Sequence, residues 1–167
     1  MRSGIALGSN IGDRLGHLQE GFRRILRLND PAGPVRRSAI YETSPVDSPP
    51  DASAYLNAVV EIEFAGPAIT LLDALSQIER DMGRPSKRPR NAPRIIDLDV
   101  LYTGNLTLNN PEITIPHPRL VQRRFILAPL AEIAPDLILP GQSKSVQELL
   151  NQLEDQSSVQ RIAERLG

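Results

Sequence analysis

Two aspartates, Asp97 and Asp99, stand one residue apart within the apolar run at residues 95–101. In a strand, alternation would send the apolar neighbours into the core and both carboxylates to the opposite face, roughly 7 Å apart at Cα. Asp is a poor strand former and adjacent carboxylates repel, so a bound cation would offset the cost. Oxygen ligands beside phosphates suit Mg²⁺. A bare pair of this kind is more often a solvated strand face, or one aspartate paired with arginine.

A second group of side chains is cationic and lies immediately before the aspartates. No acidic residue occurs within residues 84–94, which contain five cations: Arg84, Lys87, Arg88, Arg90 and Arg94. Interspersed prolines prevent a helix, and arginine forks suit phosphate oxygens. Alone, the segment is equally typical of a solvated loop or a nucleic-acid patch. Beside the aspartates it predicts Mg²⁺-dependent phosphoryl transfer, which depends on positioning and charge neutralisation.

A third cluster contains His117, Arg119, Arg123 and Arg124. A lone histidine is more often a packing or surface residue, and His17 is interpreted in that way. The sequence contains no phosphate-binding G-x-x-x-x-G-K-[ST] loop, no G-x-G-x-x-G and no G-x-S-x-G. These motifs therefore support neither a P-loop enzyme nor a serine hydrolase.

The hydrophobic patterns predict elements in the order βαββαβ. The strands are expected at 5–7, 35–43, 56–64 and 95–102, and the helices at 15–28, capped by Asp13, and at 68–82. A proline-rich loop at 44–51 joins two of the strands. Beyond them we expect a small hairpin within 105–114, a proline-punctuated segment at 117–140 and helices at 145–153 and 156–166.

This order predicts an α+β fold with a ferredoxin-like antiparallel sheet. Two helices would cover one face and leave the other face for a ligand. No domain boundary interrupts residues 1–167, so we expect a single domain whose tail, from about residue 153, is a peripheral helix.

Composition narrows the function classes. The chain has 167 residues, 40% hydrophobic and 23% charged, a net charge of −1 and no cysteine. The absence of cysteine excludes disulfides and zinc–thiolate sites. The near-neutral charge argues against nucleic-acid and membrane partners, and no apolar run approaches a membrane span. We expect a cytoplasmic monomer with small-molecule substrates.

Residues 90–101 resemble the signature of the hydroxymethyldihydropterin pyrophosphokinases. The resemblance continues, in order, at residues 7–10, 41–45, 55–58, 78–84, 116–120 and 123–130. It implies Mg²⁺-dependent transfer of pyrophosphate from ATP to 6-hydroxymethyl-7,8-dihydropterin in folate biosynthesis, with AMP as the second product. It also implies a ferredoxin-like α-β-α sandwich in which loops close over the substrates.

The resemblance assigns roles to individual residues. Asp97 and Asp99 would bind two Mg²⁺ ions and, with Arg84 and Arg94, form the catalytic centre. ATP would contact Arg84, Lys87, Arg90, Arg94, His117 and Arg123. The pterin would contact Thr43, Ser44, Val46, Tyr55, Asn57 and Phe125.

Three positions differ from better-known members of that family. Asn91 stands where some carry tryptophan, Ser86 where some carry arginine, and Pro118 where some carry tyrosine. Three other functions remain as alternatives: another Mg²⁺-dependent phosphoryl or nucleotidyl transferase, a metal-dependent phosphodiesterase or nuclease, and a non-catalytic ligand-binding module. The phosphodiesterase or nuclease would need a longer basic surface, and the binding module would not need paired aspartates beside five cations.

Overall fold

A computed structural model describes the chain at residues 1–44, 53–85, 87, 89, 92–155 and 157–167. Its elements follow the order β1 (Arg2–Ser9), α1 (Arg14–Leu26), β2 (Arg36–Arg37), β3 (Ala39–Thr43), β4 (Tyr55–Glu63), α2 (Ala68–Asp81), β5 (Asp97–Thr103), β6 (Leu108–Asn109), β7 (Thr114–Ile115), the 3₁₀ helix η1 (Leu120–Gln122), α3 (Arg124–Ile133), α4 (Val146–Gln152) and β8 (Val159–Arg165). No helix in these ranges is long and apolar enough to cross a membrane.

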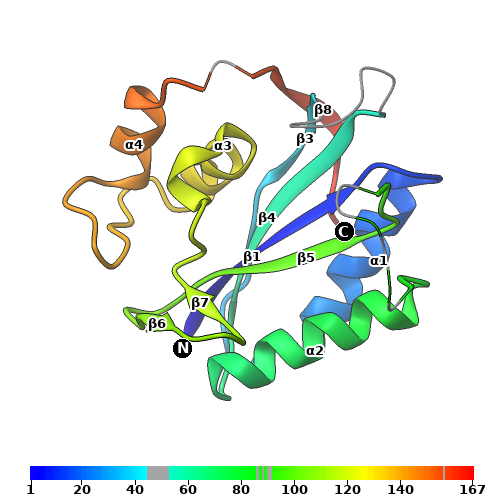
Figure 1. The fold of residues 1–167 in the computed structure, drawn as a ribbon, viewed down its shortest axis with the longest axis horizontal. Helices are drawn as coiled ribbons and strands as arrows, with labels where there is room; N and C mark the ends of the chain where they lie inside the picture. Colours follow the sequence, from blue (N-terminus) through cyan, green and yellow to red (C-terminus); the bar gives the residue numbers. More distant parts are fainter. Residues whose placement is uncertain (45–52, 86, 88, 90–91, 156) are drawn as a thin grey trace.

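The main sheet is antiparallel, with strand order β5-β1-β4-β3-β8, and β2 also pairs with β4. The first four strands in this order reproduce the ferredoxin-like arrangement, so the predicted fold class is confirmed. β1 lies between β4 and β5 (Figure 1). Residues on β4 and β5 that lie far apart in the chain are therefore brought together across β1.

Helices α1 and α2 cover one face of the sheet, as the sequence predicted (Figure 1). The Asp13 side chain accepts a hydrogen bond from Gly16 N at 3.0 Å and caps α1. Both helices bury one apolar stripe, and alternate residues of β4 and β5 meet these stripes in the first core. Its fully buried members include Ile5, Leu18, Phe22, Ile25, Val60, Ile62, Leu71, Leu75 and Ile96.

The opposite face is not left free, which corrects one expectation. Helix α3 packs there and forms a second core around Leu101, Tyr102, Leu127 and Leu130. Residues 117–140 were predicted only as a proline-punctuated segment, and they contain α3, which includes Pro129 internally. The apolar burial of α3 against the sheet outweighs the loss of one helical hydrogen bond. The site is therefore limited to the part of this face that α3 does not cover.

The tail also differs from its prediction. Residues 159–165 form strand β8 and pair with β3, whereas a helix was expected at 156–166. The weak helical pattern is overridden because β3 would otherwise be an edge strand with unpaired backbone groups. Leu166, fully buried in the first core, holds the end of this strand.

Two smaller features complete the sheet. The strand expected at 35–43 is divided into β2 and β3 at Ser38, whose hydroxyl accepts a hydrogen bond from Val59 N at 2.9 Å. Within 105–114, the hairpin is formed by β6 and β7, with β7 extending to Ile115. The helix predicted at 145–153 is confirmed as α4, and Ser145 caps it.

Candidate active site

The paired aspartates begin strand β5, and sheet register fixes what surrounds them. Gly8 of β1 pairs with Asp97 on one side and with Asn57 of β4 on the other. Directly paired residues share a face, so Asp97 and Asn57 flank Gly8 on the same surface. Leu98, between the aspartates, is buried in the first core. The predicted alternation, with Asp97 and Asp99 on the face away from that core, is therefore confirmed.

Asp97 forms ion pairs with two arginines from the basic segment. Its Oδ1 lies 2.6 Å from Arg94 Nη1 and 3.4 Å from Arg84 Nη1. Arg94 is held in turn by Asn10, whose Oδ1 accepts from Arg94 N at 2.7 Å and whose N donates to Arg94 O at 3.1 Å. Although residues 84–94 contain no acid, acids from outside the segment neutralise two of its five cations. The pairing of an aspartate with arginine, left open above, is present at Asp97.

Glu79 is a site residue to which the sequence analysis gave no role. It projects from the buried face of α2, and its carboxylate accepts from Leu98 N at 2.7 Å and pairs with Arg84. Burial raises the pKa of Glu79, partly offset by the Leu98 amide and the charge of Arg84. Because β5 is an edge strand, Glu79 satisfies an amide between the two aspartates that no strand can reach. The signal in the sequence was its spacing, four residues after Leu75 on the apolar stripe.

Asp99 lies in a different electrostatic setting. Among the described residues, none forms an ion pair with its carboxylate. Burial, followed by the negative charges of Asp97 and Glu79, raises the pKa of Asp99 to about 7. Arg94 and Arg123 act in the opposite direction without cancelling this effect. Among the described residues, the nearby cations therefore do not offset the burial and the negative charge that act on Asp99.

Residues after β7 bring further cationic groups to this end of β5. His117 N donates to Leu101 O at 2.8 Å, which attaches the segment to the strand. Burial, and then the charges of Arg123 and Arg119, lower the pKa of His117. The guanidinium of Arg123 lies 5.4 Å from the centre of the Phe125 ring. The lowered pKa favours the neutral imidazole of His117, which can offer a ring nitrogen to a polar ligand.

Three of the residues expected to contact the pterin, Thr43, Tyr55 and Asn57, lie together on β3 and β4. Asn57 Nδ2 donates to Thr43 Oγ1 at 2.6 Å, and Thr43 pairs with Tyr55 in register. Burial and the charge of Asp97 raise the pKa of Tyr55. A Cβ on Gly8 would lie 3.0 Å from Asn57 Oδ1, so glycine leaves room beside that oxygen. Ser44 follows this pair, and its N donates to Ser158 O at 3.3 Å.

The remaining predicted residues divide into two groups. Lys87 is described and exposed, and Phe125, the second residue of α3, is partly buried against the second core. Val46 and Arg90 lie outside the described residues, as do Ser86, Arg88 and Asn91. His17, interpreted as a packing residue, makes a 3.1 Å hydrogen bond between its Nδ1 and Ile11 O.

Comparison with known proteins gives consistent matches. The family model described as 7,8-dihydro-6-hydroxymethylpterin-pyrophosphokinase (HPPK) matches residues 4–135. A Haemophilus influenzae protein named 2-amino-4-hydroxy-6-hydroxymethyldihydropteridine pyrophosphokinase is 38% identical over 155 residues, which cover 93% of this chain and 94% of the relative. A Methylorubrum extorquens protein of the same name is 38% identical over 161 residues, covering 96% and 98%.

Solved structures agree in fold. A crystal structure of an HPPK-DHPS in complex with substrates matches with a TM-score of 0.68 at 13% identity, and covers 90% of this chain. Plasmodium falciparum HPPK-DHPS with pteroate matches with a TM-score of 0.66 at 16% identity. This chain spans only 44% and 42% of those longer chains. Since the family model matches most of the chain and the bacterial relatives match over nearly their whole length, the chain belongs to the 7,8-dihydro-6-hydroxymethylpterin-pyrophosphokinase family and is an enzyme of this class.

Proposed function

We propose that this chain transfers the pyrophosphoryl group of ATP to the hydroxymethyl oxygen of 6-hydroxymethyl-7,8-dihydropterin. The products are AMP and the pterin diphosphate. The names of the family and of its bacterial relatives support the pterin substrate, and the name of a 44% identical Arabidopsis thaliana relative, a folate synthesis bifunctional protein, supports the pathway. The observation that carries the proposal is the Asp97–Asp99 pair beside Arg84 and Arg94.

The aspartate pair has the chemistry that Mg²⁺ requires. Mg²⁺ is typically held by one or two carboxylates together with substrate phosphates and water. Asp99 has a raised pKa because of burial and neighbouring negative charge, and a divalent cation would restore its ionised form. Asp97 and Asp99 would hold two Mg²⁺ ions, the number implied by the family resemblance. When bound, the metal neutralises phosphate charge and polarises the attacking hydroxyl.

The arginines would exchange partners when nucleotide binds. Arg84 and Arg94 now neutralise Asp97, and a metal ion there would release their forks for the triphosphate. Arg84 keeps a second acid, Glu79, which fixes its position during the exchange. Lys87, His117, Arg123 and, outside the described residues, Arg90 would complete the nucleotide contacts.

The pterin would bind on the β3–β4 side of Gly8. Asn57 Nδ2 is engaged by Thr43, so Asn57 Oδ1 remains as an acceptor for the amino or ring N–H groups of a pterin. Tyr55 and Phe125 supply aromatic surface, and Ser44 and Val46 extend the contact along the chain. This arrangement would place the pterin next to Asp97, across one glycine.

The reaction is an in-line displacement. The pterin hydroxyl oxygen forms a bond to the β-phosphorus of ATP, and the bond from that phosphorus to the α,β-bridging oxygen breaks. AMP leaves with this oxygen, and the hydroxyl proton passes to water or to the nucleotide. Arg84 and Arg94 stabilise charge on the transferred group.

Product identification tests this function. The protein is incubated with Mg·ATP and 6-hydroxymethyl-7,8-dihydropterin, and phosphorus NMR and mass spectrometry identify both products. We expect AMP and a pterin that has gained two phosphates. ADP with a pterin monophosphate would replace the proposal by a simple kinase, and hydrolysis of ATP without a pterin product would contradict pterin transfer.

A further inference from the structure

The short connection between β1 and α1, residues 10–13, together with Arg14 at the start of α1, contacts both sides of the candidate site. At its start, Asn10 exchanges two hydrogen bonds with the backbone of Arg94, three residues before Asp97. At its end, Arg14 reaches the β3–β4 side. This connection therefore joins the segment that contains the proposed phosphate-binding arginines to the two strands expected to bind the pterin.

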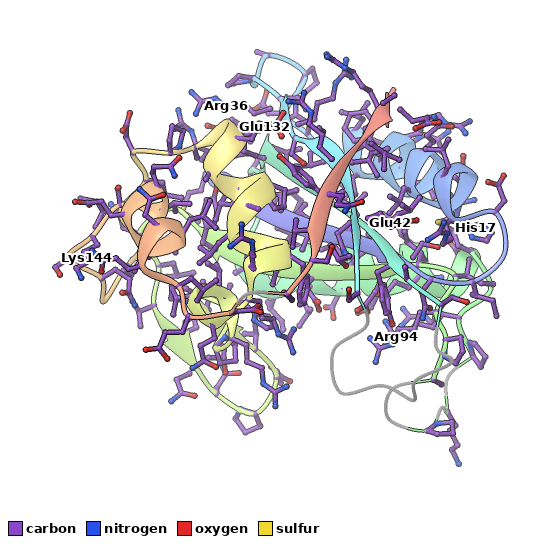
Figure 2. The ribbon with its side chains drawn as sticks, turned by 90° about the horizontal axis from the view of Figure 1, so that it is seen from above. His17, Arg36, Glu42, Arg94, Glu132 and Lys144 are labelled. Carbon is purple, nitrogen blue, oxygen red and sulfur yellow. The ribbon has the colours of Figure 1, made fainter. Side chains whose placement is uncertain are left out.

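Arg14 bonds to both strands of the β3–β4 pair where they leave the sheet. Its Nη1 donates to Ala54 O at 2.8 Å, and its Nη2 lies 2.9 Å from Glu42 Oε2. Glu42 precedes Thr43, and Ala54 precedes Tyr55, so one guanidinium bridges the residues next to the last strand pair, Thr43–Tyr55. Figure 2 shows Glu42 beside α1, the helix on which His17 is labelled.

The start of α1 fixes where Arg14 points. Gly12 has a φ of +68°, a left-handed conformation that favours glycine, and the Asp13 side chain caps the helix at Gly16 N. Arg14 is consequently the first residue of α1. Its side chain, 30% exposed, starts from a rigid helix end and not from a loop.

We propose that Arg14 is a positioning residue for pterin binding, and this rests on the function proposed above. Arg14 holds Glu42 and Ala54, and these fix the spacing of Thr43 and Tyr55. Thr43 in turn accepts the hydrogen bond that orients Asn57. The role needs an arginine because a planar fork bonds two acceptors at once, whereas a lysine ammonium offers no fixed fork.

An alternative is that the Arg14–Glu42 pair is an ordinary surface ion pair. Glu42 is 42% exposed, and such pairs contribute little to stability. The two readings therefore differ in what changes on substitution. A surface pair would affect neither ligand, whereas a positioning residue would affect the pterin selectively.

Binding measurements separate these readings. Calorimetry would give the Kd of Mg·α,β-methylene-ATP, whose scissile bridge is blocked, and then the Kd of 6-hydroxymethyl-7,8-dihydropterin with that analogue saturating. The variants are Arg14→Met, Arg14→Lys and Glu42→Gln. The matched control is Arg24→Met, because Arg24 is also on α1, also 30% exposed and also ion-paired, but to Glu20.

For Arg14→Met we expect a pterin Kd about tenfold higher and an analogue Kd within about twofold of wild type, as two charge-assisted hydrogen bonds are lost. Arg14→Lys and Glu42→Gln, which each keep one contact, should raise the pterin Kd about threefold. Arg24→Met should change neither constant. Glu42→Gln decides the question if Arg14→Met does not fold.

Three results would overturn the inference. Unchanged pterin binding in Arg14→Met and Glu42→Gln would leave only a surface ion pair. Equal losses of pterin and analogue affinity would indicate general disruption instead of pterin positioning. If the wild-type protein binds the analogue but not the pterin, the proposed function fails, and the role of Arg14 fails with it.

Discussion

Two carboxylate clusters lie on the same face of the sheet, one near each end of β1. The closed cluster is centred on Glu61 of β4, across Gly4 from Tyr102. The open cluster contains Asp97 and Asp99, with Asp97 across Gly8 from Asn57. In both clusters a β1 glycine separates polar side chains of β4 and β5, and in both the acids are largely shielded from water.

The clusters differ in how their negative charge is satisfied. Glu61 is 3% exposed, accepts from Tyr102 Oη at 2.6 Å and forms ion pairs with Arg2 and Arg36 at 3.5 and 3.6 Å. The Tyr102 ring fills the space above Gly4, where a Cβ would lie 2.2 Å from it. The Tyr102 ring and hydroxyl and the two arginines occupy the surroundings of Glu61, which indicates that this cluster contributes to the fold.

The open cluster has the opposite balance. Asp97 forms ion pairs with two arginines, whereas Asp99 forms no ion pair with any described residue. Burial and the charges of Asp97 and Glu79 raise the pKa of Asp99. Residue type and burial do not distinguish these two clusters. They differ in how many cationic partners each carboxylate has.

The largest expected effect is on turnover. Replacing Asp97 or Asp99 by alanine should lower kcat by at least about a thousandfold, or about 4 kcal/mol, because charge neutralisation at the phosphates is lost. Glu61→Gln should keep kcat within about threefold, since its cluster lies at the other end of β1 from the proposed site. Steady-state rates at saturating Mg·ATP and pterin measure this. Near-normal rates for both aspartate variants would remove the distinction between the clusters.

The next largest effect is on the free energy of unfolding. We expect substitution to lower it in the closed cluster and to leave it unchanged or raise it in the open cluster. Glu61→Gln should lower the free energy of unfolding by about 1–3 kcal/mol, because Arg2 and Arg36 lose a buried charged partner. Glu63→Gln is the matched control, two residues along β4 and 31% exposed. Asp99→Ala should leave the metal-free protein as stable as wild type or more so. Denaturant unfolding tests both, and a strongly destabilised Asp99→Ala would assign that residue to the fold.

The smallest expected effect is a pH dependence of the metal-free protein. The folded-state pKa of Asp99 is raised to about 7, so folding favours its protonated form. This stabilisation is complete below the ordinary carboxyl pKa and is lost as the pH rises through about 7. Between pH 5 and pH 8, wild type should lose about 1–2 kcal/mol relative to Asp99→Asn, since each pKa unit is about 1.4 kcal/mol before screening by solvent. Thermal melts of both proteins from pH 5 to pH 8 test this. An equal change of stability with pH in the two proteins would contradict the raised pKa of Asp99.

Much of the fold followed from local patterns. Alternation identified β4 and β5, helical spacing identified α1 and α2, and Asp13 was visible as a cap. Elements whose state depends on distant partners were not predictable. β8 is a strand because it pairs with β3. Helix α3 tolerates Pro129 because its apolar packing in the second core stabilises it.

The site residues also divide into those predictable from local patterns and those that depend on distant partners. The aspartate pair was predicted from spacing, because strand alternation is a local property. The arginine partners of Asp97 were not predicted, since they depend on how the segment ending at Arg94 packs beside the start of β5. Glu79 was missed because its role requires α2 to lie against an edge strand, which no local pattern encodes. Gly8 acquires its meaning only from register with β4 and β5.

The most direct test of the central claim is calorimetric titration of α,β-methylene-ATP into wild type, Asp99→Asn and Glu61→Gln, each with Mg²⁺ and without any divalent cation. We predict that Mg²⁺ strengthens nucleotide binding at least about tenfold in wild type and in Glu61→Gln but not in Asp99→Asn. This result would establish the open cluster as a cation site and the closed cluster as structural. Equal Mg²⁺ dependence in all three proteins would contradict the account.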